Sequence, residues 1–382
     1  MLKDLKSFIL RNLTGTKLHI SILLIVWVMA VASRFYANGL SFGFDYSIFQ
    51  PDGVLYALRT YMFLGEDQLT AAKLIESWYF TYGSSGNHFD PASILPQNTP
   101  AWGLVAPRVL YPFLSIPFVS IFGMYGLLIV PSLSLLLLIL CIYFIAKKYS
   151  QPNLGVVLGI VILTSPTVLR WMIANITDSL FVGLFALVCL VFESKERKVQ
   201  TPLVIGILIV LTSITRFATP IWLAIAIVDF LNGRRGRALF VSLLTLIATI
   251  PTFLTQPSNS VLPREGQLTV IKKLIALPES FGKILFFEVA ELAVLDRLLL
   301  ILLALAFILS ITSIRNESSL RFILILLSVW AIGAINGSIG VNFRYQLPAI
   351  SFACVVLIAN SEHLRDWFFG AIRDIKRKET QQ

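Results

Sequence analysis

Charged residues are scarce in this sequence of 382 residues. Lys, Arg, Asp and Glu make up 14% of it, whereas a soluble domain contains about 25%. Hydrophobic residues reach 57%, and the mean hydropathy is +0.81. Many apolar runs approach the roughly 20 residues that cross a bilayer as a helix, and they lack the period-two alternation of a transmembrane barrel. The composition therefore argues against a soluble protein and predicts an all-α, polytopic membrane protein.

Cysteine and histidine are also rare, with three residues of each. The cysteines lie inside apolar runs without CxxC spacing, which predicts packing residues and argues against a disulfide framework. The histidines show no HExxH or other ligand spacing, so no histidine metal site is expected. No GxGxxG or P-loop pattern indicates a nucleotide-binding fold. The first apolar run has no convincing cleavage site, and we expect it to be retained as a helix.

Basic residues exceed acidic residues by 31 to 21, which gives a formal net charge of +10. Such a surplus is also found in nucleic-acid-binding proteins, but here it lies in short loops and tails, as the positive-inside rule describes. We therefore expect the basic loops and the tail at 361–382 in the cytoplasm, and no nucleic-acid partner. The basic clusters lie at residues 3–17, 195–198, 234–237, 315–321 and 373–378.

The apolar pattern predicts one transmembrane domain over residues 1–382, with about ten to twelve membrane helices. A first helix at about 18–36 precedes a long polar stretch, 37–107, whose acidic excess indicates an external loop. Two segments of this loop, DGVLYALRTYMFL and DQLTAAKLIESWYF, have the pattern of short amphipathic helices on the membrane surface. Residues 256–283 form a second polar stretch, also expected outside.

The charge rule gives a consistent topology only if one segment between residues 109 and 172 is broken, re-entrant or half-length. Proline removes a helical hydrogen bond and clashes with the preceding turn. We therefore expect the break in LTSPTVLRW, where Pro166 follows Ser165.

Charged residues that meet the ends of apolar segments are the candidates for function, because burying an unpaired charge in a membrane costs several kcal/mol. Arginine binds phosphate with a two-pronged hydrogen-bonding fork, and a carboxylate can serve as a general base. Each residue has a plainer explanation alone, because arginines reach headgroups and aspartates cap helices and turns. Their gathering on one side favours a site. The residues expected at the outer face are Asp45, Asp52, Arg108, Asp178, Arg216 and Arg344.

Two other groups of acidic residues carry less weight. Asp45 and Asp52 offer oxygen ligands that suit a shared divalent cation, but two acids seven residues apart give this little support, and no other cofactor is predicted. Glu288, Glu291, Asp296 and Arg297 lie near the start of the long apolar segment expected at 284–314, and their spacing favours pairing along one helix rather than a functional role.

The order of the motifs around these residues resembles the GT-C superfamily of integral membrane glycosyltransferases. The resemblance covers most of the chain, and PDGVLY is similar to the Asp-Gly-x-x-Tyr form found in some bacterial members. The sequence departs from the family because its first loop lacks an adjacent Asp-Asp, Asp-Glu or Asp-x-Asp pair. It also shows no large C-terminal soluble domain of the kind that oligosaccharyltransferases carry. The motifs, in order, are QPDGVLY, PRVLYP, TDSLF, TRFATP and FRYQLP.

The resemblance implies a mannosyltransferase-like enzyme in a bacterial plasma membrane. It would transfer a sugar, with inversion, from a polyprenyl-phosphate donor to a hydroxyl of a lipid, glycan or protein acceptor at the outer face. Asp52, with Asp45 as the alternative, would be the general base, and Arg344 with Arg216 or Arg108 would bind the donor phosphate. The residues expected to line the substrate site are Asp178, Tyr56, Tyr345 and Trp102.

Two other functions fit the sequence. A polysaccharide polymerase or ligase also uses polyprenyl-linked donors, but a large outer loop late in the chain would favour it, and here the long loop comes first. A lipid or solute transporter would be favoured by inverted repeats and helices broken at the midplane, whereas the predicted charges lie at helix ends.

Overall fold

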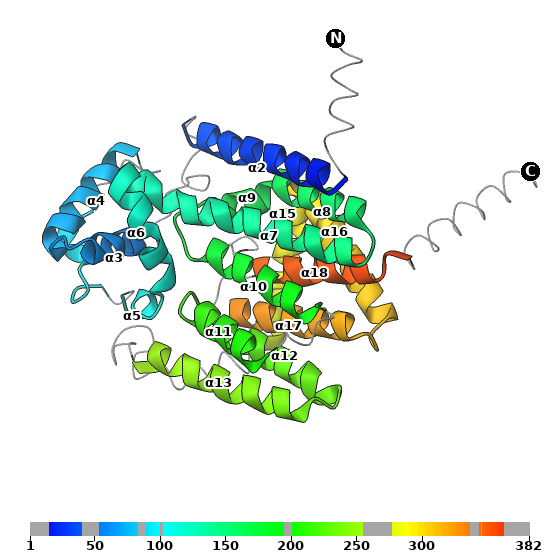
Figure 1. Cartoon of the computed structure of the whole chain (residues 1–382). Coiled ribbons are helices and arrows are strands. Elements are labelled where there is room, and N and C mark those ends of the chain that lie inside the picture. Colours follow the sequence, from blue (N-terminus) through cyan, green and yellow to red (C-terminus); the bar gives the residue numbers. More distant parts are fainter. Residues whose placement is uncertain are drawn as a thin grey trace, which may run out of the picture.

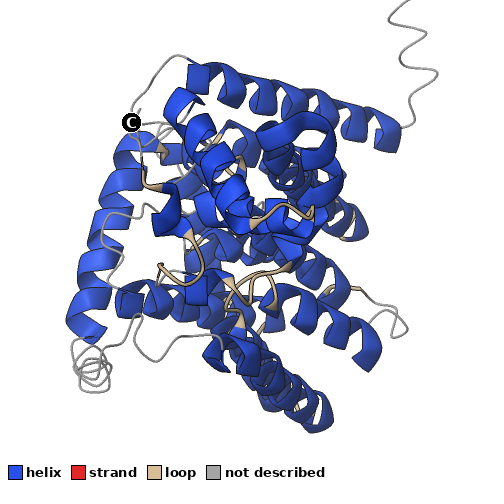
Figure 2. Cartoon of the chain, turned by 90° about the vertical axis from the view of Figure 1, so that its left-hand side faces the viewer, coloured by secondary structure: helices blue, strands red, loops and turns tan. Residues whose placement is uncertain are grey.

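The computed structural model contains only helices and connecting loops among the residues it describes (Figure 2). This confirms the all-α prediction. The described residues are 15–39, 53–82, 89–99, 102–194, 201–254, 277–336, 344 and 346–362.

Helices α7, α10 and α18 pack against one another in the centre of the molecule, and the other long helices surround them (Figure 1). Phe185 of α10 is fully buried against Trp222 of α12, with ring centroids 5.9 Å apart. Gly183 allows α10 to approach α7 closely, because a Cβ there would lie 3.0 Å from the carbonyl oxygen of Ser134. The helices of this bundle are α2 (Gly15–Gly39), α7 (Ile129–Lys148), α8 (Pro152–Thr164), α9 (Pro166–Met172), α10 (Asp178–Phe192), α11 (Pro202–Ser213), α12 (Thr219–Leu231), α13 (Arg235–Leu254), α15 (Leu277–Leu295), α16 (Arg297–Thr312), α17 (Glu317–Asn336) and α18 (Leu347–Ala359).

A smaller group of helices covers one end of this bundle and has a hydrophobic cluster of its own (Figure 1). The two predicted short helices are present as α3 and α4, and the side chain of Asp67 begins α4 by accepting hydrogen bonds from the amides of Leu69 and Thr70. The sequence suggested that α3 would lie on the membrane surface with one open polar face. In the structure most of α3 is buried between α4 and α6. The elements are α3 (Gly53–Phe63), α4 (Gln68–Tyr82), η2 (Pro91–Ile94), α5 (Trp102–Val105), α6 (Leu110–Phe122) and η3 (Gly123–Leu128).

Two helices of the bundle are broken, and the breaks contact each other. Helices α8 and α9 meet at Ser165 with a bend of 74°, which confirms the break expected in LTSPTVLRW. Residues 284–314 were expected to form one segment but are divided at Asp296, whose carboxylate caps α16 through the amide of Leu299 and accepts a hydrogen bond from the Ser165 hydroxyl. The expected pairing of Asp296 along its own helix is therefore wrong.

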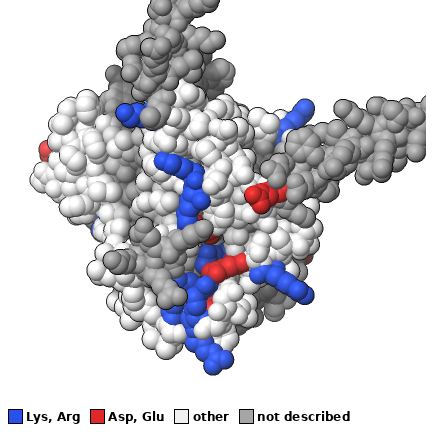
Figure 3. All heavy atoms as spheres, turned by 45° about the vertical axis from the view of Figure 1, so that its right-hand side comes forward, with Lys and Arg blue, Asp and Glu red and all other residues white. Residues whose placement is uncertain are grey.

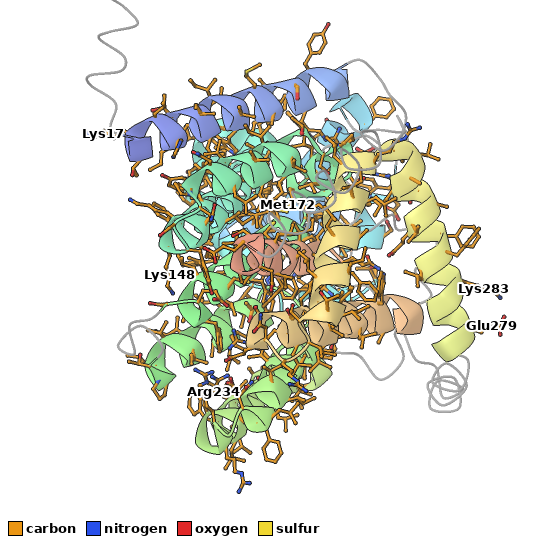
Figure 4. All side chains as sticks on the ribbon, turned by 90° about the vertical axis from the view of Figure 1, so that its right-hand side faces the viewer. Lys17, Lys148, Met172, Arg234, Glu279 and Lys283 are labelled. Carbon is orange, nitrogen blue, oxygen red and sulfur yellow. The ribbon has the colours of Figure 1, made fainter. Side chains whose placement is uncertain are left out.

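Glu288 also bonds to another helix rather than along its own. Its carboxylate accepts a 2.8 Å hydrogen bond from the indole nitrogen of Trp330 on α17. Glu279 and Lys283, by contrast, form an exposed pair along α15 and point away from the bundle (Figure 4).

Two described segments, Gly15–Tyr36 and Leu110–Lys148, are long and apolar enough to cross a membrane. The bent pair α8–α9 would be a third if it forms one span, and five shorter apolar helices accompany them. These findings agree with membrane association, while a bundle of ten to twelve crossings stays a prediction.

The bundle has two ends that carry different polar groups. Helix α10 runs from Asp178 to Phe192, and its 15 residues correspond to a length of about 22 Å. We call the end of the bundle beside the α3–α6 group the Asp178 end, and we call the opposite end the Arg234 end. Helix α2 begins and α18 ends on the side away from the α3–α6 group (Figure 1).

Candidate functional site

Asp178 contacts two arginines that come from distant parts of the chain. Asp178 opens α10, Arg216 follows α11, and Arg344 precedes α18. Helices α10 and α18 begin at the Asp178 end, and α11 ends there, so the fold brings the three residues together. The Oδ2 atom of Asp178 lies 2.9 Å from Nη2 of Arg344, and Oδ1 pairs with Nη1 of Arg216.

This ion pair lies inside the protein. Asp178 is 2% exposed and Arg216 is 9% exposed. The guanidinium of Arg344 also lies 5.2 Å from the ring centroid of Trp171, a distance at which a cation is attracted to an aromatic face. These contacts hold the guanidiniums in fixed orientations.

A second row of polar side chains adjoins the ion pair through Thr177, the residue before Asp178. The hydroxyl of Tyr56 accepts a 2.9 Å hydrogen bond from Nη1 of Arg108 and lies 3.2 Å from the Thr177 hydroxyl. Tyr56 is 1% exposed and packs edge-to-face against Tyr111. Because the Tyr56 oxygen accepts the hydrogen bond from Arg108, the proton of the Tyr56 hydroxyl is available for a hydrogen bond to Thr177. This row links the α3–α6 group to the start of α10.

The start of α3 lies against the same region. A Cβ at Gly53 would overlap the side chain of Asn175, so only glycine permits this approach. Asn175 in turn donates a 2.6 Å hydrogen bond to the hydroxyl of Tyr79 on α4. Gly53 directly follows Asp52 in the sequence, so the described neighbour of the predicted base contacts the loop that leads into Asp178.

The structure brings together five of the predicted site residues and places a sixth, Trp102, at the edge of the hydrophobic cluster that contains Tyr56. Trp102 lies in α5, where its ring is 5.7 Å from the Arg59 guanidinium, and it has no described contact with the five. Asp45, Asp52 and Tyr345 lie outside the described residues. The five are Tyr56, Arg108, Asp178, Arg216 and Arg344.

Three residues of the site were not predicted from the sequence. Thr177 lies within the TDSLF motif, so its position beside Asp178 gave a signal. Trp171 and Asn175 gave none, because their roles depend on how α9 and the loop after it pack against Arg344 and α3.

The charges of the site favour an anionic ligand. Arg108, Arg216 and Arg344 contribute +3 and Asp178 contributes −1, a formal sum of +2. Guanidiniums that are partly buried and fixed by neighbours bind phosphate or carboxylate well. Among the described residues, no group of three or more His, Cys, Asp and Glu could hold a metal ion, and Asp45 and Asp52 lie outside that set.

No protein-family model, curated protein or solved structure matches this chain.

Proposed function

We propose that the protein is a membrane glycosyltransferase that moves a sugar from a polyprenyl-phosphate donor to an acceptor hydroxyl at the Asp178 end. The observation that carries this proposal is the pairing of Arg216 and Arg344 with Asp178, next to Arg108, which is linked through Tyr56 to the residue before Asp178. Three guanidiniums from three separate segments form one site with a formal excess of positive charge. Such a site suits a phosphate group that lies at the edge of an apolar bundle.

Each residue has a role in this proposal. Arg344 and Arg216 stabilise the charge that develops on the leaving phosphate, while Asp178 orients both of them. Arg108 completes the phosphate site and is itself positioned by Tyr56. Asp52 accepts the proton of the acceptor hydroxyl while the oxygen of that hydroxyl attacks the anomeric carbon from the face opposite the phosphate. General-base catalysis of this kind typically contributes about 10²–10⁴-fold to the rate.

The sequence order supports placing the base beside this site. Asp52 is bonded to Gly53, and Gly53 contacts Asn175, three residues before Asp178. The close contact leaves no space for a side chain at position 53, because the amide side chain of Asn175 lies against the α-carbon of Gly53.

The broken helices α8–α9 and α15–α16 raise the alternative of a transporter, because such breaks often bind a substrate or an ion. Here the break at Asp296 is occupied by protein groups. Its Oδ2 atom accepts hydrogen bonds from the Ser165 hydroxyl and the Thr167 amide, and its Oδ1 atom accepts one from the Leu299 amide. These contacts favour a structural role for the break, so the glycosyltransferase is the better supported proposal.

Binding of a polyprenyl monophosphate to the purified protein tests the phosphate site. Native mass spectrometry in detergent should detect the bound lipid, and the matching polyprenol without phosphate should bind much more weakly. Arg344→Ala should reduce the phosphate-dependent binding by about tenfold or more, since a hydrogen bond to a charged group contributes about 1.5–3 kcal/mol.

Glu279→Gln is the matched control, because Glu279 pairs only at the surface of α15 and should bind the lipid as the wild type does. Equal binding of the phosphate and the alcohol by the wild-type protein would contradict the proposal.

A further inference from the structure

A polar pocket lies at the Arg234 end of the bundle, at the opposite end of α10 from Asp178. Its volume is about 460 Å³, which is in the range of pockets that bind small ligands. Basic and acidic side chains gather on this face of the molecule (Figure 3), and Arg234 lies where α13 meets the start of α17 (Figure 4). Residues that line the pocket include Tyr149, Glu193, Arg234, Arg237, Glu317 and Arg321.

The charged groups of this pocket form a continuous network. Asp229 is fully buried and pairs with Arg234 and Arg237, with distances of 2.9 Å and 2.5 Å. Glu317 pairs with Arg234 and with Arg321. Arg321 is 4% exposed, and a carboxylate oxygen of Glu193 lies 3.6 Å from it.

Charges of both signs line the pocket. Three arginines contribute +3, and Glu193 and Glu317 contribute −2. The buried Asp229, which pairs with two of these arginines, brings the whole network to zero. The other oxygen of Glu193 accepts a 2.5 Å hydrogen bond from the Tyr149 hydroxyl, and burial together with the Glu193 charge raises the pKa of Tyr149, which keeps that hydroxyl protonated. A ligand of a single charge would meet unfavourable groups here, whereas a ligand with one group of each sign would match both.

An apolar groove is lined by the same helix, α13, beginning three residues after the pocket residue Arg237. Helices α11 and α13 line it over a volume of about 500 Å³, with Phe240 and Leu244 among its residues. These two residues follow Arg237 by three and seven positions, so all three lie along one face of α13. Gly206 of α11 forms part of the groove, and a Cβ there would lie 3.3 Å from Leu244 and 3.6 Å from Phe240.

We propose that this pocket and groove together bind one phospholipid whose headgroup carries a phosphate and a primary ammonium group. Arg234 and Arg237 hold the phosphate, Glu193 and Glu317 accept hydrogen bonds from the ammonium, and an acyl chain lies along α11 and α13. A primary ammonium has three donors, which a trimethylated amine lacks. The site is separate from the Asp178 site, and this inference does not depend on the proposed sugar transfer.

Lipid binding to the delipidated, full-length protein tests the inference. Native mass spectrometry should be performed with phosphatidylethanolamine, phosphatidylcholine and phosphatidylglycerol of identical acyl chains. We expect phosphatidylethanolamine to bind about tenfold more tightly than the other two, because hydrogen bonds to charged groups contribute about 1.5–3 kcal/mol. Equal affinity for the three lipids would overturn the proposal.

Three variants separate the headgroup from the groove. Glu193→Gln should remove the preference for phosphatidylethanolamine, because the ammonium loses one of its two carboxylate acceptors. The remaining acceptor, Glu317, is also paired with Arg321. Gly206→Leu should fill the groove and weaken binding of the whole lipid, while the water-soluble glycerophosphoethanolamine should bind unchanged. Gly282→Leu, at a glycine with open space around it, should bind all three lipids as the wild type does. If Glu193→Gln and Gly206→Leu both keep the wild-type preference and affinity, the pocket and groove are not the lipid site.

Discussion

Replacing Asp178 with Asn tests the central ion pair of the candidate site. The change keeps the shape of the side chain but removes its negative charge. Arg216 and Arg344 then lose the carboxylate that both of them contact. Because Asp178 is 2% exposed, water cannot readily replace it.

The size of the effect follows from this burial. Removing one partner of a buried ion pair costs about 3–5 kcal/mol, since a buried charge loses its compensation. Unfolding entropy is about 2.1 cal/mol/K per residue, which for the whole chain converts this loss into a decrease in Tm of about 4–6 °C.

Thermal unfolding of the purified protein in one detergent measures this decrease. Asp229→Asn provides a comparison from the other end of the bundle, because Asp229 is also buried and pairs with two arginines. It should lower Tm by a similar amount, whereas Glu279→Gln, at an exposed pair, should leave Tm unchanged. If Asp178→Asn unfolds at the wild-type temperature, the ion pair does not hold the site together and the reasoning is wrong.

Three further predictions concern the donor phosphate site, the general base and the membrane topology. Arg344→Lys keeps the charge but loses the two-pronged fork, so sugar transfer should fall markedly. If Arg344→Lys and Arg344→Ala both keep wild-type activity, Arg344 only anchors its segment at the membrane surface. Asp52→Asn should abolish transfer while donor binding persists, and Asp45→Asn should be milder unless the two residues share a cation, in which case EDTA should also inactivate. A cysteine introduced at Ser84 should react with an impermeant thiol reagent in intact cells, because the loop at 37–107 is expected outside. Background labelling should be low, since all three native cysteines are buried. Labelling only after permeabilisation would place this loop in the cytoplasm and contradict the predicted topology.

The sequence shows which charged residues lie at the ends of the apolar segments, and most residues of the candidate site could be predicted in this way. Alternating helices return to the same side, so Asp178, Arg216 and Arg344 were expected at one end. Their pairing could not be predicted, because Asp178 and Arg344 are separated by 166 positions and only tertiary packing brings them together. Trp102 was expected to line the sugar site, although aromatic residues near membrane surfaces also simply anchor helices. In the structure its ring lies 5.7 Å from the Arg59 guanidinium.

The two helix breaks differ in how well the sequence predicts them. Pro166 gives a local chemical reason for the first break, and the structure confirms it. The second break, at Asp296, has no proline or glycine beside it. It depends on a hydrogen bond from Ser165, 131 positions away, so a local pattern favoured a continuous helix.

The location of a bound polyprenyl monophosphate tests the account most directly. We expect an experimental structure of the purified protein with this lipid to place the phosphate within hydrogen-bonding distance of Arg344 and of Arg216 or Arg108. The isoprenoid chain should extend from there along the apolar helices. A phosphate bound elsewhere, with the guanidiniums around Asp178 making no contact to it, would contradict the account.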